Sequence, residues 1–145
     1  MQRHLPITQR GTFYTMASGG LGHAMPAAVG VALAKPGRRV IGVIGDGSAM
    51  YSIQALWSAV QLGLPIVYVI LNNARYAALQ DFAPMFGFAP GDPVQGTDLP
   101  GIDFVALAKG MGCKGVRVAD SALLEGVLKE AFALEKPVLV EIAVA

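Results

Sequence analysis

Two side chains that carry oxygen donors, Asp46 and Asn73, stand in a sequence context that suits a metal ion and a phosphate. Asp46 is the centre of a Gly45-Asp46-Gly47 tripeptide, and Ser48 follows it. A carboxylate, an amide oxygen and a phosphate are hard oxygen donors, which Mg²⁺ prefers as ligands. Glycines allow the backbone to approach a ligand closely. The residue types therefore predict a magnesium and phosphate site, although a Gly-Asp-Gly tripeptide alone also occurs in ordinary turns.

These residues stand at the ends of two predicted strands. Residues 40–44 form a short apolar run that leads to Asp46, and residues 66–71 form a second run that leads to the Asn72-Asn73 pair. Both runs have the length of buried parallel strands and are too short to span a membrane. A right-handed crossover would make the strands parallel. Asp46 and Asn73 would then share the carboxyl edge of the sheet, where open α/β sheets bind ligands.

A helix is predicted between the two strands. Ser48 stands where its N-cap is expected, and Gly63 and Pro65 stand where it should end. The apolar residues follow the i, i+3, i+4, i+7 spacing of an amphipathic helix, namely Ile53, Leu56, Trp57 and Val60. The free N–H groups at the start of this helix would point at the same sheet edge and favour a phosphate there.

A second glycine-rich segment, residues 17–22, precedes this unit. Its glycines are Gly19, Gly20 and Gly22. Such a segment either exposes its backbone to a ligand or forms a tight loop packed against a neighbour. The residues alone leave both interpretations open.

The remaining segments alternate between strand and helix patterns. The predicted strands are residues 13–15, 114–118 and 138–144. The predicted helices are residues 23–34, residues 104–111 capped by Asp103, and a helix capped by Ser121 that carries Leu124, Val127, Leu128 and Ala131. A further helical segment has Leu79, Phe82 and Met85 on one side, which we expect to face the core rather than a pocket. Residues 87–101 are predicted to form a loop over the ligand edge or a plain excursion. The alternation predicts an α/β fold, a doubly wound and mostly parallel sheet with helices on both faces.

Composition narrows the class of protein. The chain has 145 residues, which predicts one domain, and only 14% of them are charged against 54% hydrophobic. Soluble domains usually carry about 25% charged residues, so we expect other chains or domains to cover part of the surface. The net charge of +1 does not indicate a nucleic-acid-binding protein. With no membrane-length apolar run, no secretory signal pattern and a single cysteine, Cys113, we expect a cytoplasmic protein.

The combined pattern resembles the thiamine diphosphate (ThDP) enzymes. It includes GDG at 45–47 and NN at 72–73, and the longer stretches GGLGHAMPAAVGVALA and GDGSAMYSIQALW are similar to those of benzoylformate decarboxylases, in a group that includes acetolactate synthases and pyruvate decarboxylases. The resemblance runs through nearly the whole chain and is weakest over residues 84–97. It implies that residues 1–145 form a single diphosphate- and Mg²⁺-binding domain of the ThDP-binding fold, the C-terminal part of a larger three-domain enzyme.

The same resemblance implies which residues hold ThDP and Mg²⁺. Asp46 and Asn73 would ligate the metal ion with their side chains, and Arg75 with its main-chain carbonyl. The residues implied to bind the cofactor are Gly19, Gly20, Leu21, Gly45, Asp46, Gly47, Ser48, Asn73, Tyr76 and Ala77. Leu21 would have a catalytic role, because its side chain would wedge under the cofactor and hold it bent, so that the cofactor's own imine base meets the reacting carbon.

Two positions depart from the family pattern. Ala74 and Ala77 stand where the family often has glycine. The departure leaves the conformation of the loop open without affecting the implied metal ligands.

The implied activity is the ThDP- and Mg²⁺-dependent, non-oxidative decarboxylation of a small 2-keto acid similar to benzoylformate. The alternatives are carboligation of the acetolactate synthase type, a non-catalytic interaction module of the same fold, and a Mg²⁺-dependent phosphoryl-transfer or nucleotide-binding domain. The last alternative lacks the expected G-x-x-x-x-G-K-[ST] loop.

The glutamates indicate that the site is incomplete. In the related enzymes a glutamate from a separate pyrimidine-binding domain protonates the cofactor, which prepares its base. No glutamate precedes Glu125 in this chain, and none lies in the glycine loop or the GDG–NN unit. We therefore expect a pyrimidine-binding domain on the same full-length chain or a second subunit, a homo-oligomer (dimer or tetramer), no nucleic-acid or membrane partner, and no activity from the isolated chain.

Overall fold

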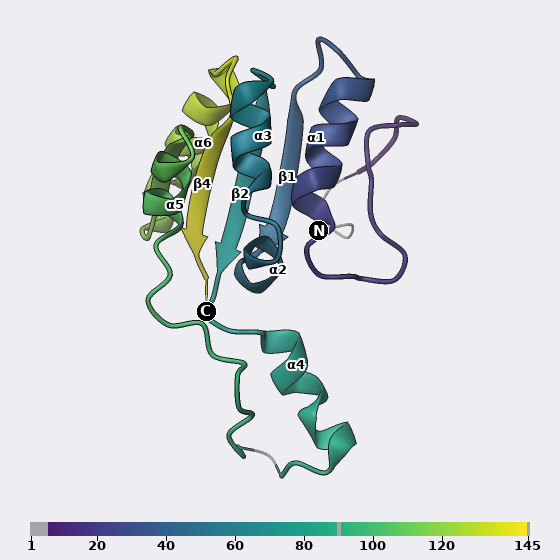
Figure 1. The fold of residues 1–145 in the computed structure, drawn as a ribbon, viewed down its shortest axis with the longest axis vertical. Coiled ribbons are helices and arrows are strands. Elements are labelled where there is room, and N and C mark those ends of the chain that lie inside the picture. The colour runs from purple at the N-terminus through teal and green to yellow at the C-terminus, as the bar shows by residue number, and fades with distance from the viewer. Residues whose placement is uncertain (1–5, 90, 145) are drawn as a thin grey trace.

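The computed structural model describes residues 6–89 and 91–144, which form one parallel sheet with helices on both faces (Figure 1). The strands are β1 (Val40–Gly45), β2 (Ile66–Asn72), β3 (Lys114–Val118) and β4 (Val138–Ala143), in the spatial order β1-β2-β4-β3. The predicted α/β class and the parallel pairing of β1 with β2 are confirmed. The predicted strand at residues 13–15 is wrong, because this segment does not pair with the sheet.

Helices cover the two faces of the sheet unequally. The helices are α1 (Ala24–Ala34), α2 (Asp46–Met50), α3 (Ala55–Gln61), α4 (Ala77–Phe82), α5 (Phe104–Gly110) and α6 (Leu124–Ala133), with single 3₁₀ turns at Ala83–Phe86 and Ser121–Leu123. α1, α3 and α5 pack on one face, and α6 packs on the other (Figure 1).

Strand β2 shows how the apolar pattern builds both halves of the core. Successive side chains of a strand point to opposite faces. Ile66, Tyr68 and Ile70 therefore lie under α1, α3 and α5. Val67 and Val69 lie under α6. A central strand buried on both faces reads as a continuous apolar run, and this explains why the sequence indicated its bounds well.

The predicted helix after β1 is broken into two pieces. α2 begins at Asp46 with Gly45 as its N-cap, and a turn over residues 51–54 separates it from α3. Ser48 thus lies inside α2, and its assignment as N-cap is wrong. Trp57 is also not part of the apolar stripe, since 57% of it is exposed.

The cap of the last helical segment shifts by one residue. The predicted cap was Ser121, but the side chain of Asp120 accepts a hydrogen bond from the Ala122 N–H at 2.9 Å. Asp103 caps α5 as predicted, accepting from the Ala106 N–H at 3.0 Å.

Leu79, Phe82 and Met85 do not join the core. All three are exposed, Met85 by 77%. Their segment extends away from the sheet beyond its carboxyl edge (Figure 1). Helical periodicity indicates that one side is apolar but does not indicate what covers it, and in this structure nothing in the described residues covers it.

The outer edge of β1 is open within the described part of the chain. β2 is its one strand neighbour there. Ile41 and Val43 are exposed on the sheet face that carries α6, because α6 packs over β2, β3 and β4 and not over β1. No helix among the described residues has both the length and the apolar character needed to cross a membrane.

One buried polar atom has a testable effect on stability. Tyr68 is fully buried, and its hydroxyl has no hydrogen-bond partner in the described residues. Burial, and secondarily Cys113, raises the pKa of the Tyr68 phenol above its ordinary value. An unpaired buried hydroxyl costs about 1–3 kcal/mol, so Tyr68→Phe should raise the free energy of unfolding by about 1 kcal/mol at neutral pH.

The difference in the free energy of unfolding between Tyr68→Phe and the wild type should grow above pH ~10, the ordinary tyrosine pKa. There the unfolded chain loses the Tyr68 proton while the folded chain retains it, so the wild type loses stability as pH rises. Urea unfolding at pH 7 and pH 10.5 measures both effects. Leu56→Ala, at another fully buried position, is the control and should cost about 2–5 kcal/mol. A Tyr68→Phe variant less stable than wild type would contradict the expectation.

Candidate functional site

Asp46 and Asn73 meet at the carboxyl edge of the sheet. The Arg75 N–H lies 3.3 Å from Asp46 Oδ2 and 3.3 Å from Asn73 Oδ1. Two acceptor oxygens from the ends of adjacent strands therefore share one donor. The sequence predicted that these two side chains lie together, and the shared contact agrees with that arrangement.

The carboxylate of Asp46 is held in a fixed orientation. Asp46 is 4% exposed, and its Oδ1 accepts a hydrogen bond from the Gly47 N–H at 2.9 Å. It lies in the first turn of α2, where the helix dipole stabilises a negative charge. A buried carboxylate with so few partners is suited to receive a cation.

The glycine loop is tied to α2 at Gly22. The Gly22 N–H donates to Ser48 Oγ at 3.0 Å, and Ser52 Oγ donates to the Gly22 carbonyl at 2.7 Å. Ser48 thus anchors the loop through its side chain. This contact ties Gly22 to α2, whereas Gly19 and Gly20 line a cavity beside α1 and β1. Sequence reasoning missed Ser52, and the available signal was its position one helical turn after Ser48.

Leu21 projects from this anchored loop. Leu21 is 46% exposed, although its side chain is apolar. An exposed leucine held by a fixed backbone is available to contact a ligand. The loop therefore packs against the α2 region, as one interpretation of the glycine segment predicted, and exposure of its backbone to a ligand stays a prediction.

Two tyrosines border the site. The rings of Tyr51 and Tyr76 form an edge-to-face pair with centroids 6.4 Å apart. A Cβ atom on Gly47 would overlap the Tyr76 ring, so any larger residue there requires the Tyr76 side chain to move. Burial, then Tyr51 and then Asp46 raise the pKa of the Tyr76 phenol. The sequence predicted a backbone role for Tyr76. It did not indicate Tyr51, and the available signal was an aromatic residue that lies outside the apolar stripe of the predicted helix.

The loop after Asn73 adopts a left-handed conformation without a glycine. Ala74 has φ +56°, which L side chains rarely adopt. The Ala74 N–H donates to Asn72 Oδ1 at 2.9 Å, and the Ala74 carbonyl accepts from the Leu99 N–H at 2.7 Å. These two hydrogen bonds hold the loop in a conformation that the sequence had left open, because Ala74 stands where the family often has glycine.

The next two residues are tied to a distant segment. Arg75 forms an isolated antiparallel bridge with Asp98, and the Tyr76 N–H donates to the Thr97 carbonyl at 2.7 Å. Ala77 then begins α4. Part of the predicted loop over residues 87–101 therefore supports the site from outside the sheet.

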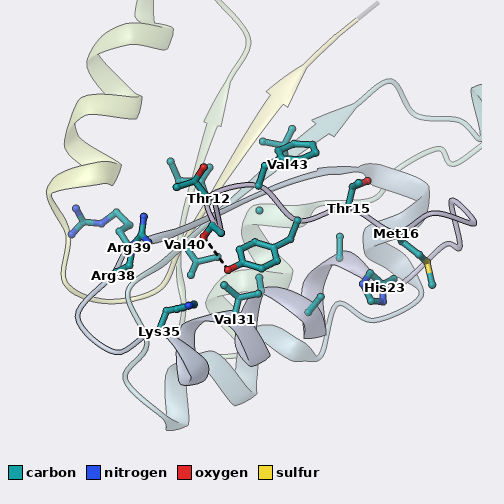
Figure 2. A pocket seen from close by; sticks show the side chains of 18 of the residues that line it. Thr12, Thr15, Met16, His23, Val31, Lys35, Arg38, Arg39, Val40 and Val43 are labelled. Carbon is teal, nitrogen blue, oxygen red and sulfur yellow. Dashed lines mark hydrogen bonds between the residues drawn. The ribbon is translucent and has the colours of Figure 1, made fainter. Parts of the chain in front are cut away.

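A separate cavity lies beside β1. It has a volume of about 410 Å³ and runs along the open edge of β1, between α1 and residues 11–16 (Figure 2). Lys35, Arg38 and Arg39 lie around its end near the start of β1, away from Asp46, and Gly19 and Gly20 border it as well. We place the candidate site at the carboxyl edge because the oxygen donors converge there, whereas this cavity is a space beside the outer edge of β1.

The donor set fits a magnesium ion that is also bound to phosphate. The described residues contain no cluster of three or more His, Cys, Asp or Glu side chains. An ion at Asp46 would therefore have one carboxylate and would take its other ligands from the Asn73 amide, a main-chain carbonyl and phosphate oxygens. Mg²⁺ commonly binds through one or two carboxylates together with substrate phosphates.

Comparison with known proteins gives one consistent family. The family described as "Thiamine pyrophosphate enzyme, C-terminal TPP binding domain" matches residues 1–142. Benzoylformate decarboxylase of Pseudomonas aeruginosa is 47% identical over 140 residues, which are 97% of this chain and 26% of that protein. Acetolactate synthase of Bacillus subtilis is 34% identical over 124 residues, which are 86% of this chain and 21% of that protein.

A solved structure extends the likeness to the fold. Benzoylformate decarboxylase from Polynucleobacter necessarius superposes with a TM-score of 0.88 at 36% identity, over 97% of this chain and 27% of that chain. The chain thus spans roughly a quarter of the length of these relatives.

Proposed function

Because the chain belongs to the thiamine pyrophosphate enzymes, as their C-terminal TPP-binding domain, we propose that it supplies the diphosphate- and Mg²⁺-binding half of a decarboxylase site. Thiamine pyrophosphate is another name for ThDP. The proposed reaction is the non-oxidative decarboxylation of a 2-keto acid similar to benzoylformate. The single observation that carries the proposal is the meeting of Asp46 and Asn73 at one backbone N–H, and the 47% identity to a benzoylformate decarboxylase supports the substrate class.

In the proposed site each residue has a limited task. Asp46, Asn73 and the main-chain carbonyl of Arg75 hold Mg²⁺. The diphosphate and the pyrimidine are bound by backbone groups of Gly19, Gly20, Gly45, Gly47, Ser48, Tyr76 and Ala77. When bound, the cofactor supplies an electron sink for the carbanion left by loss of CO₂. The protein's share is to orient the cofactor and to exclude water from it.

The proposed task of Leu21 is to support the cofactor in its bent form. The anchoring of Gly22 by Ser48 and Ser52 supports this task, because a wedge is effective only on a fixed backbone. The side chain of Leu21 remains exposed and free to meet the ligand.

Carboligation of the acetolactate synthase type is the second candidate. The 34% identity to an acetolactate synthase favours it, and the same metal and diphosphate residues would serve it. Product analysis separates the two, since decarboxylation of benzoylformate releases an aldehyde and carboligation of pyruvate releases acetolactate.

The proposed enzyme is larger than this chain. We infer a three-domain protein in which a pyrimidine-binding domain, on the same polypeptide or a second subunit, completes the site of a homo-oligomer. The length of the relatives, of which this chain covers 26% and 21%, supports the presence of further domains. We call the chain together with that domain the assembled enzyme.

Replacement of Asp46 by alanine should abolish Mg²⁺-dependent ThDP binding by the assembled enzyme. The variant loses the one carboxylate among the proposed ligands, and the loss should exceed the roughly 10–100-fold typical of residues that only support a metal ligand. Calorimetry with and without Mg²⁺ measures it. The control is Glu130→Ala, which removes an exposed carboxylate on α6. Equal affinity in the Asp46 variant and wild type would refute the metal assignment.

Truncation of Leu21 to alanine should lower turnover more than cofactor affinity. Misplacing reacting atoms by about 1 Å can cost roughly 100-fold in rate, whereas the metal and diphosphate contacts remain. Steady-state turnover and ThDP titration of the assembled enzyme measure the two quantities. Leu33→Ala, at an exposed position of α1, is the matched control. Unchanged turnover would leave Leu21 as an ordinary packing residue.

The chain alone should not catalyse decarboxylation. It offers no glutamate at the cofactor: Glu141 is buried in β4, and Glu125, Glu130 and Glu135 lie in or next to α6. We expect weak or no ThDP binding and no turnover with benzoylformate or pyruvate, even with excess cofactor and Mg²⁺. Activity should appear when the pyrimidine-binding domain is added. Robust turnover by the chain alone would overturn this division of the site.

A further inference from the structure

A buried carboxylate lies directly behind the proposed metal ligands. Glu141 is near the carboxyl end of β4, is 2% exposed, and pairs in register with Ile70 of β2 and Arg117 of β3. Burial of an unpaired charge is expensive. Glu141 is paired, since Oε2 accepts from Arg117 Nε at 2.9 Å and Oε1 accepts from Asn72 Nδ2 at 2.7 Å.

The pair is anchored at the start of α5. Arg117 also contacts Asp103, the N-cap of α5, at 3.3 Å. The hydrogen bond to Glu141, and then its charge, raise the pKa of Arg117. The position of the Glu141 carboxylate is therefore fixed by β3, β4 and α5 together.

Glu141 determines which way the amide of Asn72 points. A carboxylate can only accept hydrogen bonds, so it selects the NH₂ end of the amide. The Asn72 carbonyl oxygen must then point the other way, toward the loop. There it accepts the Ala74 N–H at 2.9 Å. A flipped Asn72 amide would set two oxygens against each other at Glu141 and would leave the Ala74 N–H without this acceptor.

The bond from Ala74 to Asn72 holds an unfavourable backbone conformation. A left-handed residue other than glycine costs about 1–2 kcal/mol, and Ala74 has φ +56°. The residue on either side of Ala74 belongs to the proposed metal site. With the backbone turned in this way, the Arg75 nitrogen lies 3.3 Å from both Asp46 Oδ2 and Asn73 Oδ1.

We propose that Glu141 is a positioning residue for the metal site and acts through Asn72. Its carboxylate fixes the Asn72 amide, which holds Ala74 left-handed and so sets Asn73 and Arg75 at the positions where they can ligate Mg²⁺. Glu141 touches neither the metal nor the cofactor in this role. The inference rests on the proposed function for the identity of the ion, but the coupling between Glu141 and Ala74 is a property of the chain itself.

The first test measures that coupling without any cofactor. A residue with positive φ has its amide and α protons unusually close, which gives a strong intraresidue NOE in the NMR spectrum. Glu141→Gln in the 145-residue chain should weaken this NOE at Ala74, because a carboxamide no longer selects the orientation of Asn72. Glu135→Gln is the matched control: it also removes a charge paired with an arginine, Arg39 at 3.0 Å, but near the amino ends of the strands.

A second variant covers the case in which Glu141→Gln does not fold. Asn72→Ala leaves the pair between Glu141 and Arg117 intact and breaks the next link. It should weaken the Ala74 NOE in the same way. A full Ala74 NOE in either folded variant overturns the proposal.

The second test is a rescue in the assembled enzyme. Glu141→Gln should weaken Mg²⁺-dependent ThDP binding by roughly 10–100-fold, the usual effect of losing a group that supports a metal ligand. Adding Ala74→Gly should restore most of the affinity, because glycine adopts positive φ without help. A residue that only stabilised the sheet would not be rescued by a change in the loop, so failure of the rescue overturns the proposal.

The two tests separate this inference from the proposed function. Loss of the Ala74 NOE together with absence of ThDP binding by the wild-type assembly would refute the proposed function and leave the role of Glu141 in the loop standing. Loss of the NOE together with rescue of binding supports both.

Discussion

The parallel, in-register pairing of β1 with β2 is the constraint on which the site depends. Val40 pairs with Ile66, and the pairing continues without a break to Gly45 and Leu71. The residues that follow the two strands therefore leave the sheet side by side. A shift of the register by one residue would turn every β1 side chain to the opposite face, and Asp46 would no longer share the Arg75 N–H with Asn73.

Several separate supports converge on this strand edge. The two serines of the α2 region hold the glycine loop from one side, and the segment around Thr97 holds the loop after β2 from another. The buried Glu141 supports the same loop from beneath. Each support is a hydrogen bond to backbone, either directly or through one amide, so the elements fix main-chain positions more than they fix side chains. This arrangement suits a site in which carbonyl and N–H groups provide much of the binding.

The sequence predicted those features that follow from local pattern. The two strands, the carboxyl edge and the proximity of Asp46 and Asn73 all follow from apolar runs that end in polar residues. Ser48 and Phe82 were misplaced for a different reason. The helix begins three residues earlier than the cap preference of Ser48 suggests, since its N-cap is Gly45. The apolar side of the segment with Phe82 has no partner in the described chain. Apolar periodicity shows which side of a helix is apolar, whereas the burial of that side depends on the elements that pack against it.

Contacts between distant segments could not have been predicted. Ser52 meets the glycine loop 30 positions away, and Glu141 meets Asn72 across 69 positions. No local periodicity marks such pairs. Glu141 even opposes the pattern, because it places a charge within an apolar strand. A rule broken in the interior of a strand is often a sign of function, and the interruption of the β4 run was the one signal available for this residue.

The open edge of β1 has a consequence for the physical behaviour of the isolated domain. Within the part of the chain that the structure describes, β1 has no strand on its outer side. The backbone groups beside exposed Ile41 and Val43 there form a template onto which another strand can add. Association through such an edge requires no unfolding, so it depends on concentration and not on the thermal stability of the core. Colloidal stability will therefore limit the concentrations at which the domain can be handled before its unfolding does, and a charged side chain on this edge would extend that limit without touching the carboxyl edge.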